Sequence, residues 1–153
     1  DYKVNRVTVT GGEPLAQPGV HALMAALLDQ EFEVSLETSG ALSVANVDPR
    51  VVKVLDVKTP GSAEVHRNLW GNFAYLQPHD QIKFVLCSRG DYDWARVQCD
   101  QYSLFERAAD VLFSPSHGAI EPRDLADWIV ADRLPVRMQL QLHKLLWGNE
   151  PGR

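Results

Sequence analysis

Cysteine is scarce in this chain, which has two in 153 residues, Cys87 and Cys99. Two cysteines are too few for a disulfide framework, and their wide spacing is unlike the clusters that ligate zinc or iron–sulfur centres. We therefore interpret both side chains as packing thiols.

A surplus of positive charge is also lacking, because 15 Lys and Arg stand against 20 Asp and Glu, for a formal net charge of −5. Binding to nucleic acid or anionic lipid requires a basic face, so direct contact with either is not expected. No apolar run approaches the roughly 20 residues that span a bilayer, and no signal peptide is recognisable. The simplest interpretation is a cytoplasmic protein.

The composition is that of one globular domain, with 45% hydrophobic and 23% charged residues over residues 1–153. This length is enough to bury a core. The sequence starts at Asp1 rather than Met and enters a strand pattern within a few residues. We therefore expect it to be a piece of a longer protein.

Short β-branched runs alternate with amphipathic segments, a pattern typical of βα units in an α/β fold with a mostly parallel sheet. Five strands are expected, at residues 7–10, 32–37, 51–58, 82–86 and 111–113. Helices are expected over 20–28, from Asp91 or Asp93 to Tyr102, and from Glu121–Pro122 onward. A final run over 136–143 alternates at period two and is expected to be extended.

The first strand runs directly into Thr10, Gly11, Gly12, Glu13 and Pro14. Two glycines permit positive φ and close approach of the backbone to a ligand, and proline prevents the strand from continuing. Each later strand also ends in a polar or glycine-containing cluster. Because parallel strands bring their carboxyl ends to one edge, these clusters predict a single large site.

Several of these segments resemble the radical S-adenosylmethionine (SAM) enzymes, and among them the 7-carboxy-7-deazaguanine synthases. The similar pieces are Thr10–Leu15, Leu36–Gly40, Asp56–Ser62, Gln81–Val85, Phe113–Ser116 and Gln139–Gly148. The first two pieces recur across the superfamily. Asp56–Ser62 and the tail Gln139–Gly148, which contains His143 and Lys144, are typical of the synthases. The resemblance implies a partial (β/α) barrel of the radical SAM type.

The resemblance also implies a reaction, the radical ring contraction of 6-carboxy-5,6,7,8-tetrahydropterin to 7-carboxy-7-deazaguanine, with loss of ammonia. This product enters the biosynthesis of queuosine and other 7-deazapurines. The implied cofactors are SAM, a [4Fe–4S] cluster and Mg²⁺, and the implied assembly is a homodimer. In the family, three cysteines after the first strand hold the cluster and a neighbouring threonine helps to hold Mg²⁺. This sequence lacks that motif, so we expect the first strand and the cluster loop to lie outside it and the chain alone to be inactive.

By the same resemblance, the expected SAM-binding residues are Gly11, Gly12, Glu13, Glu37, Thr38, Ser39, Asp56, Val57, Lys58, Ser114, Pro115, Ser116 and His117. The Gly-Gly-Glu backbone would meet the amino end of SAM, and residues 37–39 its ribose and methionyl parts. Residues 56–58 and 114–117 would complete the pocket. Thr10 and His143 would contact the pterin substrate, His143 at its carboxylate. No catalytic or metal-ligating residue is expected within the chain.

Simpler interpretations stay open at several positions. The glycine pair suits any tight turn, Asp56 and Lys58 could form a surface pair, and Ser114 and Ser116 flank a proline as in many turns. At the level of the whole chain, the alternatives are another radical SAM enzyme such as an activase, a non-catalytic scaffold, or a barrel that binds phosphate esters. The upstream coding sequence would discriminate among them.

Overall fold

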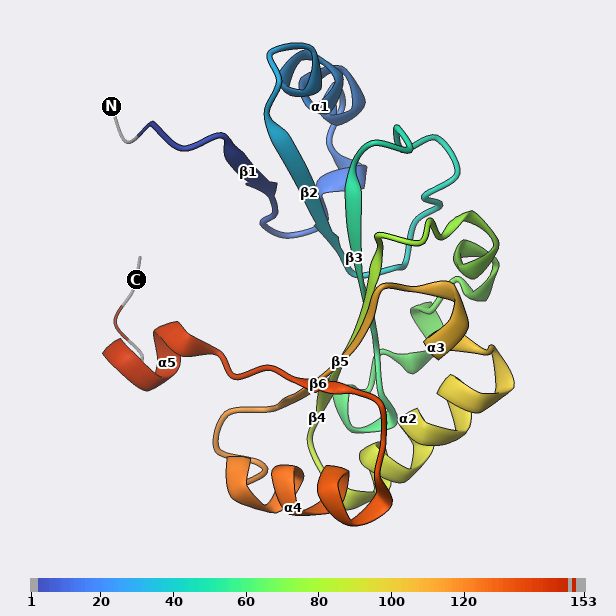
Figure 1. The fold of residues 1–153 in the computed structure, drawn as a ribbon, viewed down its shortest axis with the longest axis vertical. Helices are drawn as coiled ribbons and strands as arrows, with labels where there is room; N and C mark the ends of the chain where they lie inside the picture. The colour runs from blue at the N-terminus through green and yellow to red at the C-terminus, as the bar shows by residue number, and fades with distance from the viewer. Residues whose placement is uncertain (1–2, 149, 151–153) are drawn as a thin grey trace.

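The computed structural model describes residues 3–148 and 150, and it contains one six-stranded sheet in which every neighbouring pair is parallel. Spatial order follows chain order: β1 (Arg6–Val9), β2 (Glu33–Thr38), β3 (Val52–Val57), β4 (Gln81–Leu86), β5 (Asp110–Pro115) and β6 (Arg137–Met138). The sheet is open and curved, as in part of a barrel (Figure 1). All strands therefore present their carboxyl ends at one edge.

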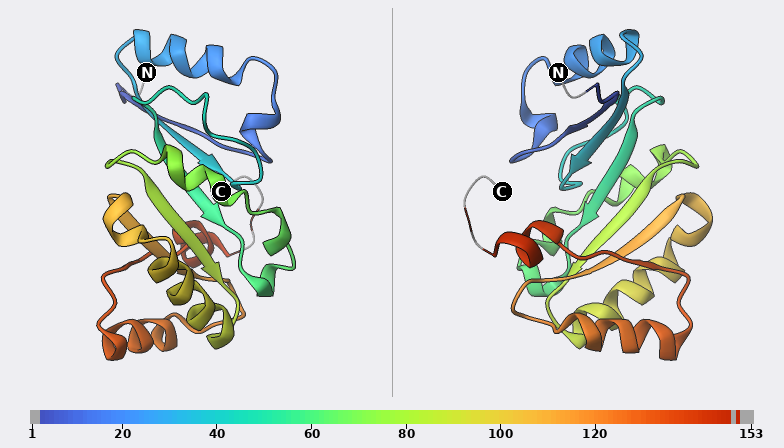
Figure 2. Two further views of the ribbon diagram at one scale, coloured as in Figure 1. Left: turned by 90° about the vertical axis from the view of Figure 1, so that its right-hand side faces the viewer. Right: turned by 60° about the vertical axis from the view of Figure 1, so that its left-hand side comes forward.

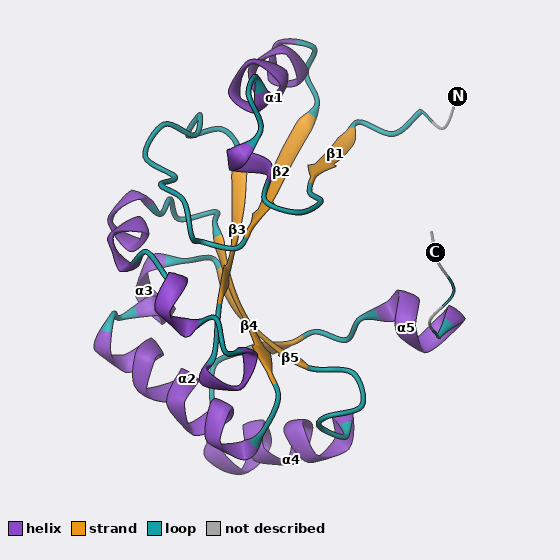
Figure 3. Ribbon diagram, turned by 180° about the vertical axis from the view of Figure 1, so that it is seen from behind, coloured by secondary structure: helices purple, strands orange, loops and turns teal. Residues whose placement is uncertain are grey.

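Helices cover the convex side of the sheet. They are α1 (Val20–Asp29), α2 (Arg89–Gln101), α3 (Leu104–Arg107) and α4 (Pro122–Asp132). The last helix, α5 (Leu142–Trp147), lies on the opposite, concave side (Figures 1 and 3). The right-hand view of Figure 2 shows α5 standing apart from α4 and α2. No helix in the described part of the chain is long and apolar enough to cross a membrane.

Two of the crossovers contain no α-helix in the described chain. The β2–β3 connection is a loop, and the β3–β4 connection carries only the 3₁₀ turns η2 (Pro60–Ser62), η3 (Val65–Arg67) and η4 (Trp70–Tyr75). A further 3₁₀ turn, η1 (Pro14–Ala16), follows β1. The buried Asn72 joins the two connections, because its amide nitrogen donates to the Gly40 and Leu42 carbonyls and its oxygen accepts from the Val44 N–H. One side chain here supplies hydrogen bonds that a helix would supply internally.

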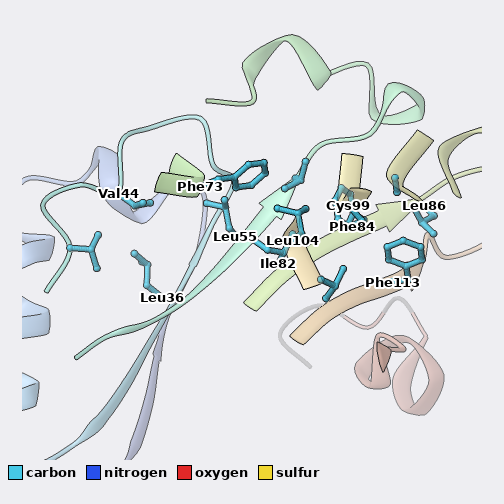
Figure 4. Packing of buried hydrophobic residues seen from close by; sticks show 14 of the residues in the cluster. Leu36, Val44, Leu55, Phe73, Ile82, Phe84, Leu86, Cys99, Leu104 and Phe113 are labelled. Atoms are coloured by element: carbon cyan, nitrogen blue, oxygen red, sulfur yellow. The ribbon is translucent and has the colours of Figure 1, made fainter. Parts of the chain in front are cut away.

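The core lies between the sheet and the convex helices. Alternate strand residues such as Leu36, Leu55, Phe84 and Phe113 are buried there against residues of the helices (Figure 4). At the amino edge of the sheet, a buried ion pair joins Lys53 Nζ to Asp80 Oδ2 at 2.7 Å.

The five earlier strands expected from the sequence are confirmed, with boundaries that differ by one or two residues. The expected strand over 136–143 is wrong for most of its length, since β6 ends at Met138 and α5 begins at Leu142. Its last ladder bond is from the Gln139 N–H to the Phe113 carbonyl, after which the chain leaves the sheet. The α2 cap also differs, because Ser88 rather than Asp91 or Asp93 is the N-cap.

Candidate functional site

The concave face of the sheet is unusually polar for a parallel sheet. Strand residues that alternate with the buried core residues include Thr8, Ser35, Glu37, Asp56, Lys83 and Ser114. Parallel sheets are commonly buried on both faces, so their strands read as near-continuous apolar runs. The alternation seen here instead leaves a polar surface on the side without the main helix layer.

In the half of this face that lies near the amino ends of the strands, the polar side chains are hydrogen-bonded or ion-paired to one another. Arg6 pairs with Glu33 at 2.7 Å, and Thr8 Oγ1 lies 2.9 Å from Ser35 Oγ. Arg137 donates to Asp110 at 2.8 Å. These contacts cross neighbouring strands, as the parallel register requires. This half of the face therefore has its polar groups already engaged.

The carboxyl-terminal half differs, because three buried side-chain oxygens there lack a hydrogen-bond partner within the described residues. They are Asp56 Oδ1 on β3, Ser114 Oγ on β5 and Gln139 Oε1 just after β6. Ser114 is 1% exposed. Buried polar atoms are nearly always paired, so a group of three unpaired oxygens on one face indicates a place for a polar ligand.

The turn after β1 is open to a ligand. Gly11 and Gly12 have φ of 98° and 25°, and a Cβ atom on either would meet nothing within 4 Å. Glycine is required there by the backbone rather than by crowding. The turn borders a cavity of about 590 Å³, also lined by Thr10, Glu13 and Pro14.

The Glu13 carboxylate itself is engaged within the protein. Oε1 accepts from Thr38 Oγ1 at 2.8 Å and from the Leu15 N–H at 3.1 Å, while Oε2 accepts from both the backbone N–H, at 2.8 Å, and the hydroxyl of Ser39. Burial raises the pKa of Glu13, but these hydrogen bonds, led by that of the Ser39 hydroxyl, outweigh burial and leave the pKa lowered. Glu13 therefore ties the end of β1 to the end of β2.

The loop after β3 is also held firmly. Lys58 Nζ lies 2.7 Å from Asp56 Oδ2, and both side chains are about three quarters buried. Asn68 fixes the backbone of Lys58, accepting from its N–H at 2.9 Å and donating to its carbonyl at 2.8 Å. The Val57 side chain faces the convex core, so only its backbone is at the ligand edge.

A second cavity, of about 400 Å³, lies between the end of β5 and the tail. Its lining includes Pro115, Ser116, His117 and Gln141. The Ser116 N–H donates to the Leu86 carbonyl at 2.8 Å, which joins the ends of β4 and β5.

The structure thus gathers the expected residues at one edge but does not place them around one shared cavity. Thr10, Gly11, Gly12 and Glu13 line the first cavity, and Pro115, Ser116 and His117 line the second. Residues of the middle strands line neither: Glu37, Thr38, Ser39, Asp56, Val57, Lys58 and Ser114. The Thr38 side chain is buried against Glu13. His143 belongs to α5 rather than to a strand, and its side chain lies outside the described part of the structure.

The described residues do not fit an iron–sulfur cluster. No group of three or more His, Cys, Asp or Glu among them is arranged to hold a metal ion. Cys99 is buried, and burial, with a smaller effect of Asp100, raises its pKa to about 12, so it is not a thiolate at neutral pH. Cys87 is only partly buried but has no second cysteine beside it among these residues.

Two further residues at this edge were not expected to matter for the site. Asp91 was expected only as a helix cap, and Asn68 was not singled out. The Ser88-x-x-Asp91 spacing is a capping-box-like signal that could have identified Asp91. The partners of Asn68 could not be read from sequence.

Comparison with known proteins gives a consistent result, although no family model matches the chain. It is 45% identical over 145 residues to the 7-carboxy-7-deazaguanine synthase of Chlorobaculum tepidum, covering 93% of this chain and 66% of the relative. It is 41% identical to the synthase of Koribacter versatilis, covering 94% and 70%. The synthase of Thermoplasma acidophilum is 33% identical, with 99% and 72% covered. The chain therefore spans about two thirds of the length of these relatives.

Among solved structures, the fold is similar to that of Streptococcus suis SuiB bound to S-adenosylmethionine. The TM-score is 0.62 over 92% of this chain and 39% of the other, at 12% sequence identity. At that identity the likeness concerns the fold alone.

Proposed function

The chain belongs to the 7-carboxy-7-deazaguanine synthase family, and on that premise we propose that it binds SAM and a pterin for the radical ring contraction that forms 7-carboxy-7-deazaguanine. The substrate would be 6-carboxy-5,6,7,8-tetrahydropterin, with ammonia as the second product. When SAM is bound beside a reduced cluster, it supplies the radical hydrogen abstraction that starts such reactions. The work of this chain is to bind, orient and shield the reactants.

The observation that carries the proposal is the set of unpaired buried oxygens on the carboxyl half of the concave face. Asp56 Oδ1, Ser114 Oγ and Gln139 Oε1 come from three strand ends. A ligand rich in hydroxyl, amino and ring N–H donors, as SAM and a reduced pterin both are, would satisfy them. The residues present therefore fit SAM.

We assign roles by position along this edge. The open backbone of Gly11 and Gly12 would receive the amino-acid end of SAM, with Glu13 fixing the turn that presents it. Glu37 is exposed on the concave face and would reach the ribose. Lys58, oriented by Asp56, and the segment Ser114–His117 would close the other side of the pocket. Thr10 and His143 would meet the pterin.

The cluster and Mg²⁺ require ligands other than the residues described. We propose that residues outside this sequence supply the three thiolates and the Mg²⁺ contact, since the described cysteines do not fit a cluster. Homodimer formation and entry of the product into queuosine biosynthesis stay predictions from family membership, and a cytoplasmic location stays a prediction from the sequence.

Ser114→Ala tests the proposal in the intact enzyme. Because the Ser114 hydroxyl has no partner within the described residues, its removal breaks no described hydrogen bond and should not lower thermal stability. If it binds SAM, the dissociation constant measured by calorimetry should rise about tenfold, the value of one good hydrogen bond.

Ser35→Ala is the matched control. Ser35 lies on the same face but in the amino-terminal half, where its hydroxyl is paired with Thr8. Its replacement should leave SAM affinity unchanged. Wild-type enzyme that binds no SAM would refute the proposed function, and unchanged affinity in Ser114→Ala would remove Ser114 from the site.

A further inference from the structure

Asp91 joins two of the strand-end loops although it lines neither of the cavities described above. It lies in the first turn of α2 and is 2% exposed. Its Oδ1 accepts from the Gly61 N–H at 2.8 Å, and its Oδ2 accepts from the Cys87 N–H at 2.9 Å. Thr59 Oγ1 lies 3.1 Å from the same Oδ2. The donors thus come from the loop after β3 and from the end of β4.

The loop after β3 rests directly on this carboxylate. A Cβ atom added to Gly61 would fall within contact distance of Asp91 Oδ2 and 3.0 Å from Cys87 Cβ. Glycine is therefore needed at position 61 because of close packing, since its φ is not in the left-handed region. No salt bridge within the described residues neutralises Asp91, so its charge is balanced by hydrogen bonds from the two loops.

The other bonds of the loop are mostly internal. Asn68 holds the backbone of Lys58, and Ser62 Oγ donates to the Thr59 carbonyl at 2.6 Å, but both partners move with the same connection. Two links join this loop to the end of β4. One runs through Asp91, which contacts Thr59 and Gly61 on the loop and Cys87 just after β4. The other is direct, from the Thr59 hydroxyl to the Val85 carbonyl at 3.1 Å. Removing the Asp91 contacts would leave the Thr59–Val85 bond as the one described side-chain link between this loop and β4, and would loosen the segment just after Lys58.

We propose that Asp91 is a positioning residue for the cofactor site: it holds the Lys58–Gly61 segment against the end of β4, and so keeps Lys58 and Asp56 in the geometry that receives SAM. This rests on the proposed function above. Asp91 does not touch the ligand. It acts through backbone groups on two loops, and misplacement of a binding loop by even about 1 Å is costly for function.

Asp91→Asn in the intact enzyme tests this. The substitution keeps the shape of the side chain but places an amide NH₂ against one of the two backbone N–H groups. We expect the dissociation constant for SAM to rise about tenfold. The KM for SAM should rise in parallel, with much less change in kcat at saturating SAM, a split that general destabilisation would not produce.

Tyr92→Phe is the matched control, because it changes the next residue of the same helix. The Tyr92 hydroxyl is bonded to Asp132 at 2.7 Å and to the Trp128 carbonyl at 3.0 Å, on the side of α4 rather than of the loops. Its loss should lower thermal stability to a comparable extent and leave the affinity for SAM unchanged. Equal SAM affinity in wild type, Asp91→Asn and Tyr92→Phe would overturn the proposal.

Gly61→Ala decides the matter if Asp91→Asn fails to fold. It retains the carboxylate but pushes the loop away from it, so SAM affinity should again fall, and an unchanged affinity would overturn the proposal. Failure of the proposed function and failure of the role of Asp91 give different results. Wild-type enzyme without SAM binding would remove both the proposed function and the role of Asp91, whereas SAM binding in wild type with equal binding in the variants would remove only the latter.

Discussion

At the scale of single residues, Glu13 shows how a motif expected to bind ligand through its backbone also has a structural carboxylate. Its two oxygens receive four hydrogen bonds from three residues, Leu15, Thr38 and Ser39. The Gly-Gly-Glu turn can therefore offer backbone groups to SAM while the side chain fixes the turn to β2. The sequence predicted the turn, but not that the Glu13 carboxylate would bond to the end of β2.

We expect Glu13→Gln to lower the free energy of unfolding by about 1–3 kcal/mol at pH 7, because the amide cannot accept all four bonds. The pKa of Glu13 is lowered below 4.5 in the folded state, so its stabilisation is present above that pH and is lost as the pH falls through the folded pKa. The difference between wild type and variant should therefore shrink below pH 4.5. Urea unfolding at several pH values measures it.

The exposed Glu106 provides a control for the size of this effect. Glu106→Gln removes a carboxylate on α3 that has no described hydrogen bond, so it should change the free energy of unfolding at pH 7 by less than about 0.5 kcal/mol. A constant difference between wild type and Glu13→Gln down to pH 3 would contradict the assigned role of Glu13.

At the scale of elements, alternation and helical spacing predicted the five long parallel strands and helices α1, α2 and α4, because each buries one side against the same core. The tail shows the limit of such patterns. Residues 136–143 alternate, yet only Arg137 and Met138 form β6, since the ladder ends where Gln139 bonds to Phe113. Leu142, Leu145 and Leu146 also fit a helical spacing, and the local pattern alone could not choose between the two.

The polar ties of the site were the part least accessible to sequence. Asp91 meets Gly61 from 30 positions away, and Asn72 meets Leu42 across the same separation. A buried Asp or Asn is recognisable only once its tertiary partners are known, because the same residues are common in exposed turns. The strand-end clusters were predictable because parallel topology brings them together whatever their partners are.

Asn72→Ala should strongly destabilise the protein, because two connections without α-helices depend on this amide. The change leaves the Val44 N–H and the Leu42 carbonyl without their partner, at a cost of about 1–3 kcal/mol for each that stays buried, while the Gly40 carbonyl keeps its bond from the Leu69 N–H. Chemical unfolding measures the loss. Gln30→Ala, which removes a single exposed contact to the Ala26 carbonyl, should cost less than about 0.5 kcal/mol. Equal effects of the two substitutions would contradict the account of these crossovers.

At the scale of the whole molecule, the apolar core and the residues proposed to bind ligand lie on opposite sides of the sheet. The convex side carries α1–α4 and the apolar core, while the concave side carries polar side chains and α5 (Figures 1 and 3). Along the concave side, polar side chains near the amino ends of the strands are hydrogen-bonded to one another, whereas three buried oxygens near the carboxyl ends have no partner among the described residues. Polarity on one face and unpaired oxygens at one edge together locate the site more narrowly than either observation alone.

This arrangement predicts where SAM will slow amide hydrogen exchange in the intact enzyme. Binding stabilises the segments it contacts, so exchange should slow at residues 10–13, 37–40, 56–59 and 114–117. Exchange should be unchanged at the strand starts, at residues 33, 81 and 110, because the polar side chains there already pair within the protein. The first and last of the protected segments border separate cavities, so protection at both would require a ligand that extends across the middle strands. Protection confined to the convex helices would place SAM elsewhere, and protection of residues 10–13 alone would reduce the site to the turn after β1.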